Sequence, residues 1–247
     1  MRCKVMGIVN VTPDSFSDGG QFFKPEEAIR RAKNLIAEGA DIIDLGGEST
    51  RPGATPISWE EEWSRIEPVL LQLTANSQRL TALVSVDTYH PETAAKAIAA
   101  GATIINCVYP EPIPEMLKLL EGNDVELVIP YRLGNKDMRR ETEDASIASR
   151  LYLDPMIGFN TTREEDVALL RSIPELAKKG RVLVGASRKR IVKKLVGEKS
   201  AVGKNIGGNV AIAVWAALNG ASVVRVHDVK ETVQALRVVD ALGEGER

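Results

Sequence analysis

The chain has 247 residues, enough to bury one large hydrophobic core, and its 44% hydrophobic and 27% charged content is that of a globular protein. Its formal net charge of −2 at pH 7 argues against a surface built to bind nucleic acid or membrane lipids. With only two cysteines, Cys3 and Cys107, neither a disulfide framework nor a cysteine-based zinc site is expected. No apolar run has the length of a membrane span, and strand-like sequence begins at once, so we expect a cytoplasmic protein with reduced thiols.

Short runs rich in Val, Ile and Leu recur along the chain and are nearly continuous, without polar alternation. This is typical of parallel strands covered by helices on their outer faces. The predicted strands are residues 4–10, 41–47, 83–88, 103–108, 126–131, 150–155, 181–187 and 222–229.

Helix-like segments lie between most of these runs. Pro25 and Pro91 each suit the first turn of a helix, and Ser58 begins a capping-box pattern with Glu61. Further helices are predicted over 163–179, over 209–219 and, weakly, within a shortened crossover at 137–149.

About eight strand–helix units in one chain of this length predict a single (β/α)8 TIM barrel over residues 1–247. A doubly wound open sheet is the structural alternative, because strand order cannot be read from one sequence.

Polar residues follow most of the predicted strands at their carboxyl ends. In a TIM barrel these ends converge on one mouth, where active sites lie. Any one of them could instead cap a helix, as Asp87 could for the helix at Pro91, but so many strand ends are hard to explain as capping. The residues are Asn10, Thr50, Arg51, Asp87, Asn106, Asp154, Ser187, Lys189, Arg225 and His227.

These residues fall into two chemical groups. Arg51, Lys189, Arg225 and His227 are cations or donors, which suit an anionic phosphate or carboxylate. Asp87, Asn106 and Asp154 supply acceptor oxygens, which suit a ring with several N–H donors. Together they predict a site for a heterocycle that carries a phosphate tail.

The chain resembles the dihydropteroate synthases of the pterin-binding barrel group. The matching stretches run in order along nearly the whole chain, each at a strand end. They are GIVNVTPDSFSDGG (7–20), GGESTRPGA (46–54), SVDT (85–88), IIN (104–106), LDP with GF (153–159), GASRK (185–189) and RVHDVKET (225–232).

The resemblance implies the condensation of a 6-hydroxymethyl-dihydropterin diphosphate with p-aminobenzoate in folate biosynthesis, with release of diphosphate. It further implies a dissociative mechanism through a pterin-methyl cation, a magnesium ion as cofactor, and a homodimer formed through the last helices.

Roles for individual residues follow from the same resemblance. Asp87, Asn106 and Asp154 would hold the pterin edge, with Lys189 near its ring. Asn10 would ligate Mg²⁺ and, with Arg225 and His227, contact the diphosphate. The loops 11–20 and 48–54 would close over the site, with Thr50 and Arg51 on the leaving group. Phe16 and Pro52 would lie beside the aminobenzoate and Ser187 would contact its carboxylate, with Gly185 also in the substrate site.

Four features depart from the family pattern, all around the predicted fourth to sixth strands. Cys107 replaces an Asp, Tyr131 and Arg132 replace a Met-His-Met type motif, the 132–150 segment is short, and Met156 replaces a Gly. Arg132 could add an anion contact or be a surface charge. Two alternatives therefore stay open beside the synthase: a non-catalytic or altered-substrate pterin-binding protein, and a folate–corrinoid methyltransferase, which has no need of the first two loop motifs.

Overall fold

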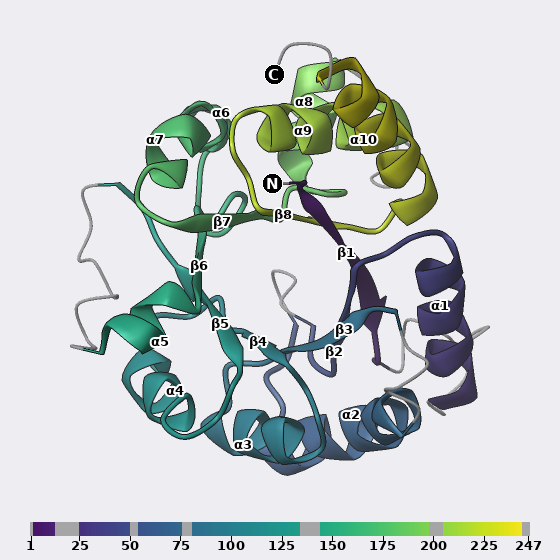
Figure 1. The fold of residues 1–247 in the computed structure, drawn as a ribbon, viewed down its shortest axis with the longest axis vertical. Helices are drawn as coiled ribbons and strands as arrows, with labels where there is room; N and C mark the ends of the chain where they lie inside the picture. Colours follow the sequence, from purple (N-terminus) through teal and green to yellow (C-terminus); the bar gives the residue numbers. More distant parts are fainter. Residues whose placement is uncertain are drawn as a thin grey trace.

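The computed structural model describes residues 2–12, 25–49, 54–75, 81–133, 144–197 and 205–243. Eight strands close into a parallel barrel in chain order, as predicted, so the open-sheet alternative is excluded (Figure 1). The strands are β1 Lys4–Asn10, β2 Ile42–Gly46, β3 Leu83–Asp87, β4 Ile104–Asn106, β5 Glu126–Pro130, β6 Leu151–Asp154, β7 Arg181–Val184 and β8 Val223–Val226.

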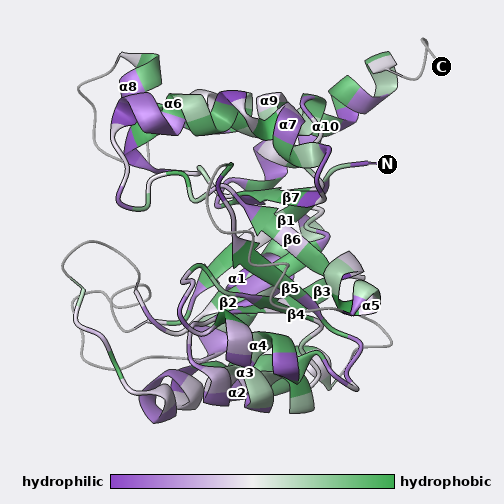
Figure 2. Ribbon diagram, turned by 90° about the vertical axis from the view of Figure 1, so that its left-hand side faces the viewer, coloured by the Kyte–Doolittle hydropathy of each residue, from purple (hydrophilic) through white to green (hydrophobic). Residues whose placement is uncertain are grey.

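Helices surround the barrel and cover the outer faces of its strands (Figure 1). The strands are mainly hydrophobic along their length, whereas the helices carry hydrophobic and hydrophilic residues (Figure 2). In the described ranges the helices are α1 Pro25–Ala37, α2 Trp59–Thr74, α3 Pro91–Ala99, α4 Ile113–Leu119, α5 Ala145–Ser149, α6 Arg163–Arg171, α7 Ile173–Ala177, α8 Arg190–Val196, α9 Ile206–Leu218 and α10 Val229–Gly243. None of these helices is long and apolar enough to cross a membrane.

Two helix predictions differ from the structure in detail. The helix expected over 163–179 is divided into α6 and α7 at Ser172, just before Pro174, whose missing N–H and fixed φ interrupt a continuous helix. Ser58 accepts a hydrogen bond from Glu61 N at 3.3 Å, but the Glu61 carboxylate pairs with Arg65 at 2.5 Å. Only one half of the predicted capping box therefore forms.

The barrel interior contains one apolar layer, to which seven strands each contribute one buried side chain. Residues two apart on a strand face the same side, so the next inward positions above this layer belong to the carboxyl-terminal mouth. The layer consists of Met6, Ile42, Ile104, Val128, Tyr152, Leu183 and Val223.

A small polar cluster lies at the amino-terminal end of the barrel and adjoins the apolar layer through Tyr152, whose ring belongs to that layer. Arg181 pairs with Glu126, and its guanidinium carbon lies 4.0 Å from the Tyr152 ring centroid. The Tyr152 hydroxyl donates to Glu126 Oε2 at 3.1 Å. We call Glu126, Tyr152 and Arg181 the floor cluster.

Candidate active site

Asp44 is the central acceptor of the barrel mouth, although it is not among the site residues predicted from the sequence. Its side chain is fully buried and lies two residues above Ile42 on β2. Ser85 Oγ donates to Oδ1 at 2.6 Å, and Asn106 Nδ2 donates to Oδ2 at 3.2 Å. Arg225 Nε donates to the same Oδ2 at 2.6 Å, so Asp44 joins β2, β3, β4 and β8.

Arg225 lies between two carboxylates. Beside its bond to Asp44, it donates from Nη2 to Asp87 Oδ2 at 2.5 Å. These two carboxylates raise the pKa of Arg225 against the opposing effect of burial, so the guanidinium stays charged. Gly185 lies beside the Arg225 side chain, since a Cβ there would be in van der Waals contact with Arg225 Cδ at 3.8 Å.

Asp87 ends β3 and has an unusual proton affinity. Burial raises its pKa to about 7, with further raising by Asp44 and Glu62 and lowering by Arg225. The free site thus holds a carboxyl group that titrates near neutral pH. An added positive charge nearby would favour its ionised form.

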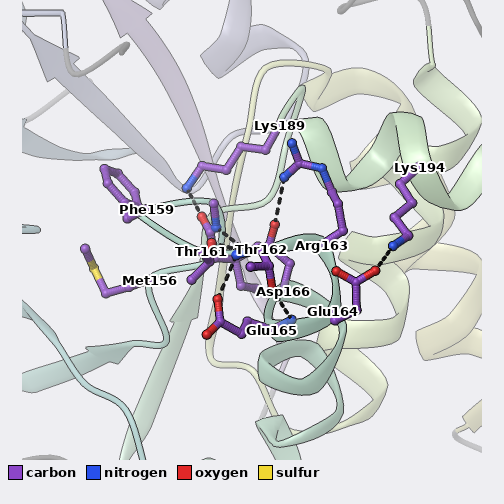
Figure 3. A network of polar contacts seen from close by, with 12 residues as sticks. Met156, Phe159, Thr161, Thr162, Arg163, Glu164, Glu165, Asp166, Lys189 and Lys194 are labelled. Atoms are coloured by element: carbon purple, nitrogen blue, oxygen red, sulfur yellow. Dashed lines mark hydrogen bonds and ion pairs between the residues drawn. The ribbon is translucent and has the colours of Figure 1, made fainter. Parts of the chain in front are cut away.

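Asp154 is buried, and its charge interacts with the opposite charge of Lys189. Met156 N donates to Asp154 Oδ1 at 2.7 Å, and burial raises the pKa of this carboxyl. Lys189 Nζ donates to the carbonyl of Ile157 at 2.6 Å and lies 4.2 Å from the ring centroid of Phe159 (Figure 3). Burial lowers the pKa of Lys189 to about 8, although Asp154 opposes this.

The loops after β7 and β8 are held together by polar contacts. The Ser187 hydroxyl accepts from His227 N at 3.2 Å and lies 3.1 Å from His227 Nδ1. Arg188 donates from Nη2 to Asp228 Oδ1 at 2.6 Å, and its own φ of 59° is left-handed. Such a conformation is costly for a residue with a Cβ and persists where surrounding contacts hold it.

Asn10 lies at the end of β1, on the same side of the mouth as Asp87. A Cβ on Gly46 would stand 3.9 Å from both Asn10 Oδ1 and Asp87 Oδ2, so the two side chains flank this glycine. Within the described ranges, no group of three or more His, Cys, Asp or Glu side chains is arranged to hold a metal ion.

The structure thus brings together every predicted site residue that it describes. They are Asn10, Asp87, Asn106, Asp154, Gly185, Ser187, Lys189, Arg225 and His227, all at the carboxyl-terminal mouth. Phe16, Thr50, Arg51 and Pro52 lie outside the described residues.

Cys107, a departure expected to remove a carboxylate from the pterin side, faces away from the barrel interior. Asn106 contacts Asp44 inside the barrel, whereas Cys107 belongs to the outer hydrophobic core and is fully buried. Burial raises the pKa of its thiol to about 12, so it is neutral. Cys107 therefore takes no charge away from the mouth.

Cys107→Asp is accordingly expected to lower the free energy of unfolding by about 3 kcal/mol, because it buries a carboxylate in an apolar environment. It is not expected to increase turnover. Urea unfolding and steady-state rates of this variant, with Cys107→Ser as the nearly isosteric control, measure both effects. A Cys107→Asp variant with raised turnover would contradict the outward orientation.

Two residues of this site beyond Asp44 have no assigned role in the sequence analysis. Phe159 belongs to the GF stretch of a matching motif, and for Arg132 the sequence allows either an anion contact or a surface charge. Arg132 is not a bare surface charge, because its Nη2 donates to the carbonyl of Phe159 at 2.9 Å. For Asp44 the available signal was a carboxylate inside an otherwise apolar strand, in register with Ser85.

The chain matches the sequence profile of the pterin binding enzymes in two overlapping segments, residues 6–143 and 134–227. It is 37% identical to the dihydropteroate synthase of Staphylococcus haemolyticus, over 99% of this chain and 97% of that protein. It is 38% identical to the dihydropteroate synthase of Escherichia coli K12, over 96% of this chain and 90% of that protein.

Comparison with solved structures points to the same family. Xanthomonas albilineans dihydropteroate synthase with 4-aminobenzoic acid superposes with a TM-score of 0.86 at 40% identity, covering 98% of this chain and 94% of that one. The Clostridium difficile enzyme in the presence of pteroic acid superposes with a TM-score of 0.84 at 36% identity, covering 98% and 97%. The barrel, its polar mouth and these relatives agree: the chain belongs to the pterin-binding enzymes and, among them, to the dihydropteroate synthases, the transferases of folate biosynthesis.

Proposed function

We propose that this chain condenses 6-hydroxymethyl-dihydropterin diphosphate with p-aminobenzoate and releases diphosphate. The observation that carries the proposal is the set of buried acceptors at the mouth. Asn106 is 1% exposed, and its Oδ1 has no hydrogen-bond partner among the described residues. Asp87 and Asp154 are the last residues of the strands β3 and β6, at the carboxyl-terminal end of the barrel. Since an unpaired buried acceptor is costly, this set favours a ring that presents several N–H donors.

The opposite side of the site suits the diphosphate. Arg225 has five N–H donors and, among the described residues, uses two of them on Asp44 and Asp87, so others can serve phosphate oxygens. His227 and Asn10 lie on the neighbouring strand ends of β8 and β1. We assign Thr50 and Arg51 to the same group as part of the proposal.

A magnesium ion fits this side by its ligand chemistry. Asn10 supplies a side-chain oxygen, and Mg²⁺ prefers oxygen ligands, keeps several waters and is commonly shared with substrate phosphates. When bound, it would neutralise negative charge on the diphosphate.

The mechanism we propose is dissociative. The bond between the pterin methylene carbon and the diphosphate oxygen breaks first, and the diphosphate leaves with the electron pair. Arg225 and His227 stabilise the charge that develops on the leaving group, while the carboxylates of Asp87 and Asp154 stabilise the pterin-methyl cation. The amine of p-aminobenzoate then attacks the methylene carbon and loses a proton. Ser187 and Gly185 orient it, with Phe16 and Pro52 as its walls, and the loops 11–20 and 48–54 exclude water.

An assay of diphosphate release tests the proposal. With both substrates and Mg²⁺, the protein is expected to release diphosphate and form dihydropteroate in equal amounts, and removal of Mg²⁺ by a chelator is expected to abolish both. Calorimetry with the pterin diphosphate alone separates the non-catalytic alternative, which would bind without turnover. No binding and no release would refute the proposal.

We also propose a homodimer and a cytoplasmic location. Large apolar side chains are exposed on three helices that pack side by side (Figure 1), and exposed patches of this kind mark protein interfaces. They are Leu195 and Val196 on α8, Ile206, Trp215 and Leu218 on α9, and Val238 and Leu242 on α10. Two buried free cysteines, Cys3 and Cys107, suit a reducing compartment.

Leu218→Glu is expected to convert this dimer to a monomer, since Leu218 is 66% exposed and a symmetric interface would bury two added charges. Light scattering after size exclusion measures the mass. Leu71→Glu, an equally apolar exposed position on α2, serves as the control and should leave the mass unchanged. A wild-type chain that runs as a monomer would refute the dimer.

A further inference from the structure

We propose that Arg132 is a positioning residue, which fixes the loop 156–160 after β6 and, through that loop, the ammonium group of Lys189. This role deepens the proposed function and rests on it wherever Lys189 is said to contact the substrate. The contacts themselves lie within the described residues and do not depend on the reaction.

The loop 156–160 holds a conformation that needs outside support. Met156 and Asn160 have φ of 63° and 50°, and Gly158 between them has φ of 78°. Left-handed backbone costs a residue with a Cβ about 1 kcal/mol or more, and it persists only where neighbouring contacts fix it. Asn adopts this conformation more readily than other residues, so Met156 in particular indicates contacts from elsewhere.

Arg132 supplies contacts at both ends of this loop. Its Nη2 donates to the carbonyl of Phe159 at 2.9 Å and to that of Met156 at 3.4 Å. Its Nε is buried and has no hydrogen-bond partner in the described part of the chain, so within these residues the hydrogen bonds of its guanidinium go to this loop. The far side of the loop is fixed by Asp166, which accepts from Gly158 N at 2.7 Å and from Thr161 Oγ1 at 2.6 Å (Figure 3).

Lys189 contacts the two residues that lie between the carbonyls held by Arg132. Its Nζ donates to Ile157 O, and the Phe159 ring lies 4.2 Å away (Figure 3). Gly158 admits the Lys189 side chain, since a Cβ there would stand 2.9 Å from Lys189 Cδ. Because Arg132 holds the carbonyls of residues 156 and 159, it sets where the carbonyl of 157 and the ring of 159 meet the ammonium.

The charge of Arg132 acts in the same region. Burial raises the pKa of Asp154, and Lys189, Arg225 and Arg132 each oppose that rise. The groups that act on Lys189 are Asp154, Asp166 and Asp87, which favour its charged form, and Arg225, which disfavours it. Loss of Arg132 would admit water and remove a positive charge, and both changes favour a protonated Lys189.

The test uses Arg132→Met, with Arg132→Lys as the conservative variant and Arg150→Met as the matched control. Arg150 also holds a loop through backbone carbonyls, donating to Leu120 O at 3.1 Å and to Val125 O at 3.2 Å, but it precedes β6 at the opposite end of the barrel. Both Met variants lose an arginine that supports a loop, and only one of those loops contacts Lys189.

Two measurements apply to each protein. The first is the pH dependence of Lys189 acylation by acetic anhydride, read by mass spectrometry as a midpoint, which is expected at the Lys189 pKa of about 8 for the wild type. Arg132→Met is expected to move this midpoint upward, so that the neutral fraction at pH 8 falls about fivefold for a rise of about one unit. The second is kcat/KM, which is expected to fall by about 10- to 100-fold with misplacement of the ammonium.

Arg132→Lys is expected to recover part of both effects, and Arg150→Met to leave both unchanged. An unmoved midpoint in Arg132→Met, or equal losses of kcat/KM in the two Met variants, would overturn the positioning role. If Arg132→Met does not fold, the acylation midpoint of Arg132→Lys is used instead. An unmoved midpoint in that variant would equally overturn the positioning role. If the wild type shows no turnover, the proposed function fails, while the acylation midpoints still test the role of Arg132.

Discussion

Arg225→Met is expected to lower the free energy of unfolding by about 3 kcal/mol and to lower turnover by at least about a hundredfold. The stability is lost because Asp44 and Asp87 remain buried without their common partner. The turnover is lost because the same guanidinium is the proposed partner of the departing diphosphate. Urea unfolding and single-turnover rates measure the two effects separately.

Two further variants distinguish these effects. Asp44→Asn in the Arg225→Met background removes one unpaired charge, so it should recover part of the stability and none of the turnover. Arg181→Met removes an arginine–carboxylate pair from the floor cluster, so it should cost about 1 kcal/mol of stability and leave turnover within about twofold. Normal turnover in Arg225→Met would contradict its assignment to the leaving group.

Lys189→Met is expected to lower kcat/KM by about a hundredfold or more and to abolish its decline at alkaline pH. Lys189 has a pKa of about 8, below its usual range, and it is cationic only below that value. If the cation is the working form, wild-type kcat/KM should decline as the pH rises through about 8. Asp87, with a pKa of about 7, must be ionised to stabilise a cation, so kcat/KM should rise as the pH increases through about 7.

Lys189→Arg provides the control for charge. An arginine stays protonated throughout the range, so the alkaline decline should disappear while some activity remains. Asp87→Asn should likewise remove the rise of kcat/KM with increasing pH on the acid side. An alkaline decline that persists unchanged in Lys189→Arg would show that another group causes it.

The sequence allowed the barrel to be predicted because each strand is a continuous apolar run and parallel strands of a closed barrel need no polar face. β1 was predicted with the bounds that the structure shows, and β5 within one residue. The division of the helix at Ser172 was missed although Pro174 marked it, since the surrounding pattern stays amphipathic. Such local signals compete with packing, which only the fold reveals.

The site residues that follow a strand were predicted from the sequence. Those that lie within a strand, or that make contacts between loops, were missed. Asp87 and Asp154 stand at strand ends, whereas Asp44 is surrounded by apolar neighbours within β2 and resembles a core position. The contact of Arg132 with Phe159 joins residues 27 apart in the chain, and it depends on how the loop after β6 turns back. No spacing rule for one element contains that information.

The apolar layer keeps two sets of ion pairs apart, at the mouth and in the floor cluster. From Arg181 to Gly185, which stands beside Arg225, four residues along the chain span about 13 Å, and the intervening Leu183 is fully buried. Each charge is paired with opposite charges on its own side of the layer, so little net field from one set reaches the other across this distance. The amino-terminal end of this barrel can therefore exchange its ion pair for other residues over evolutionary time without retuning the titrating groups that work at the opposite end.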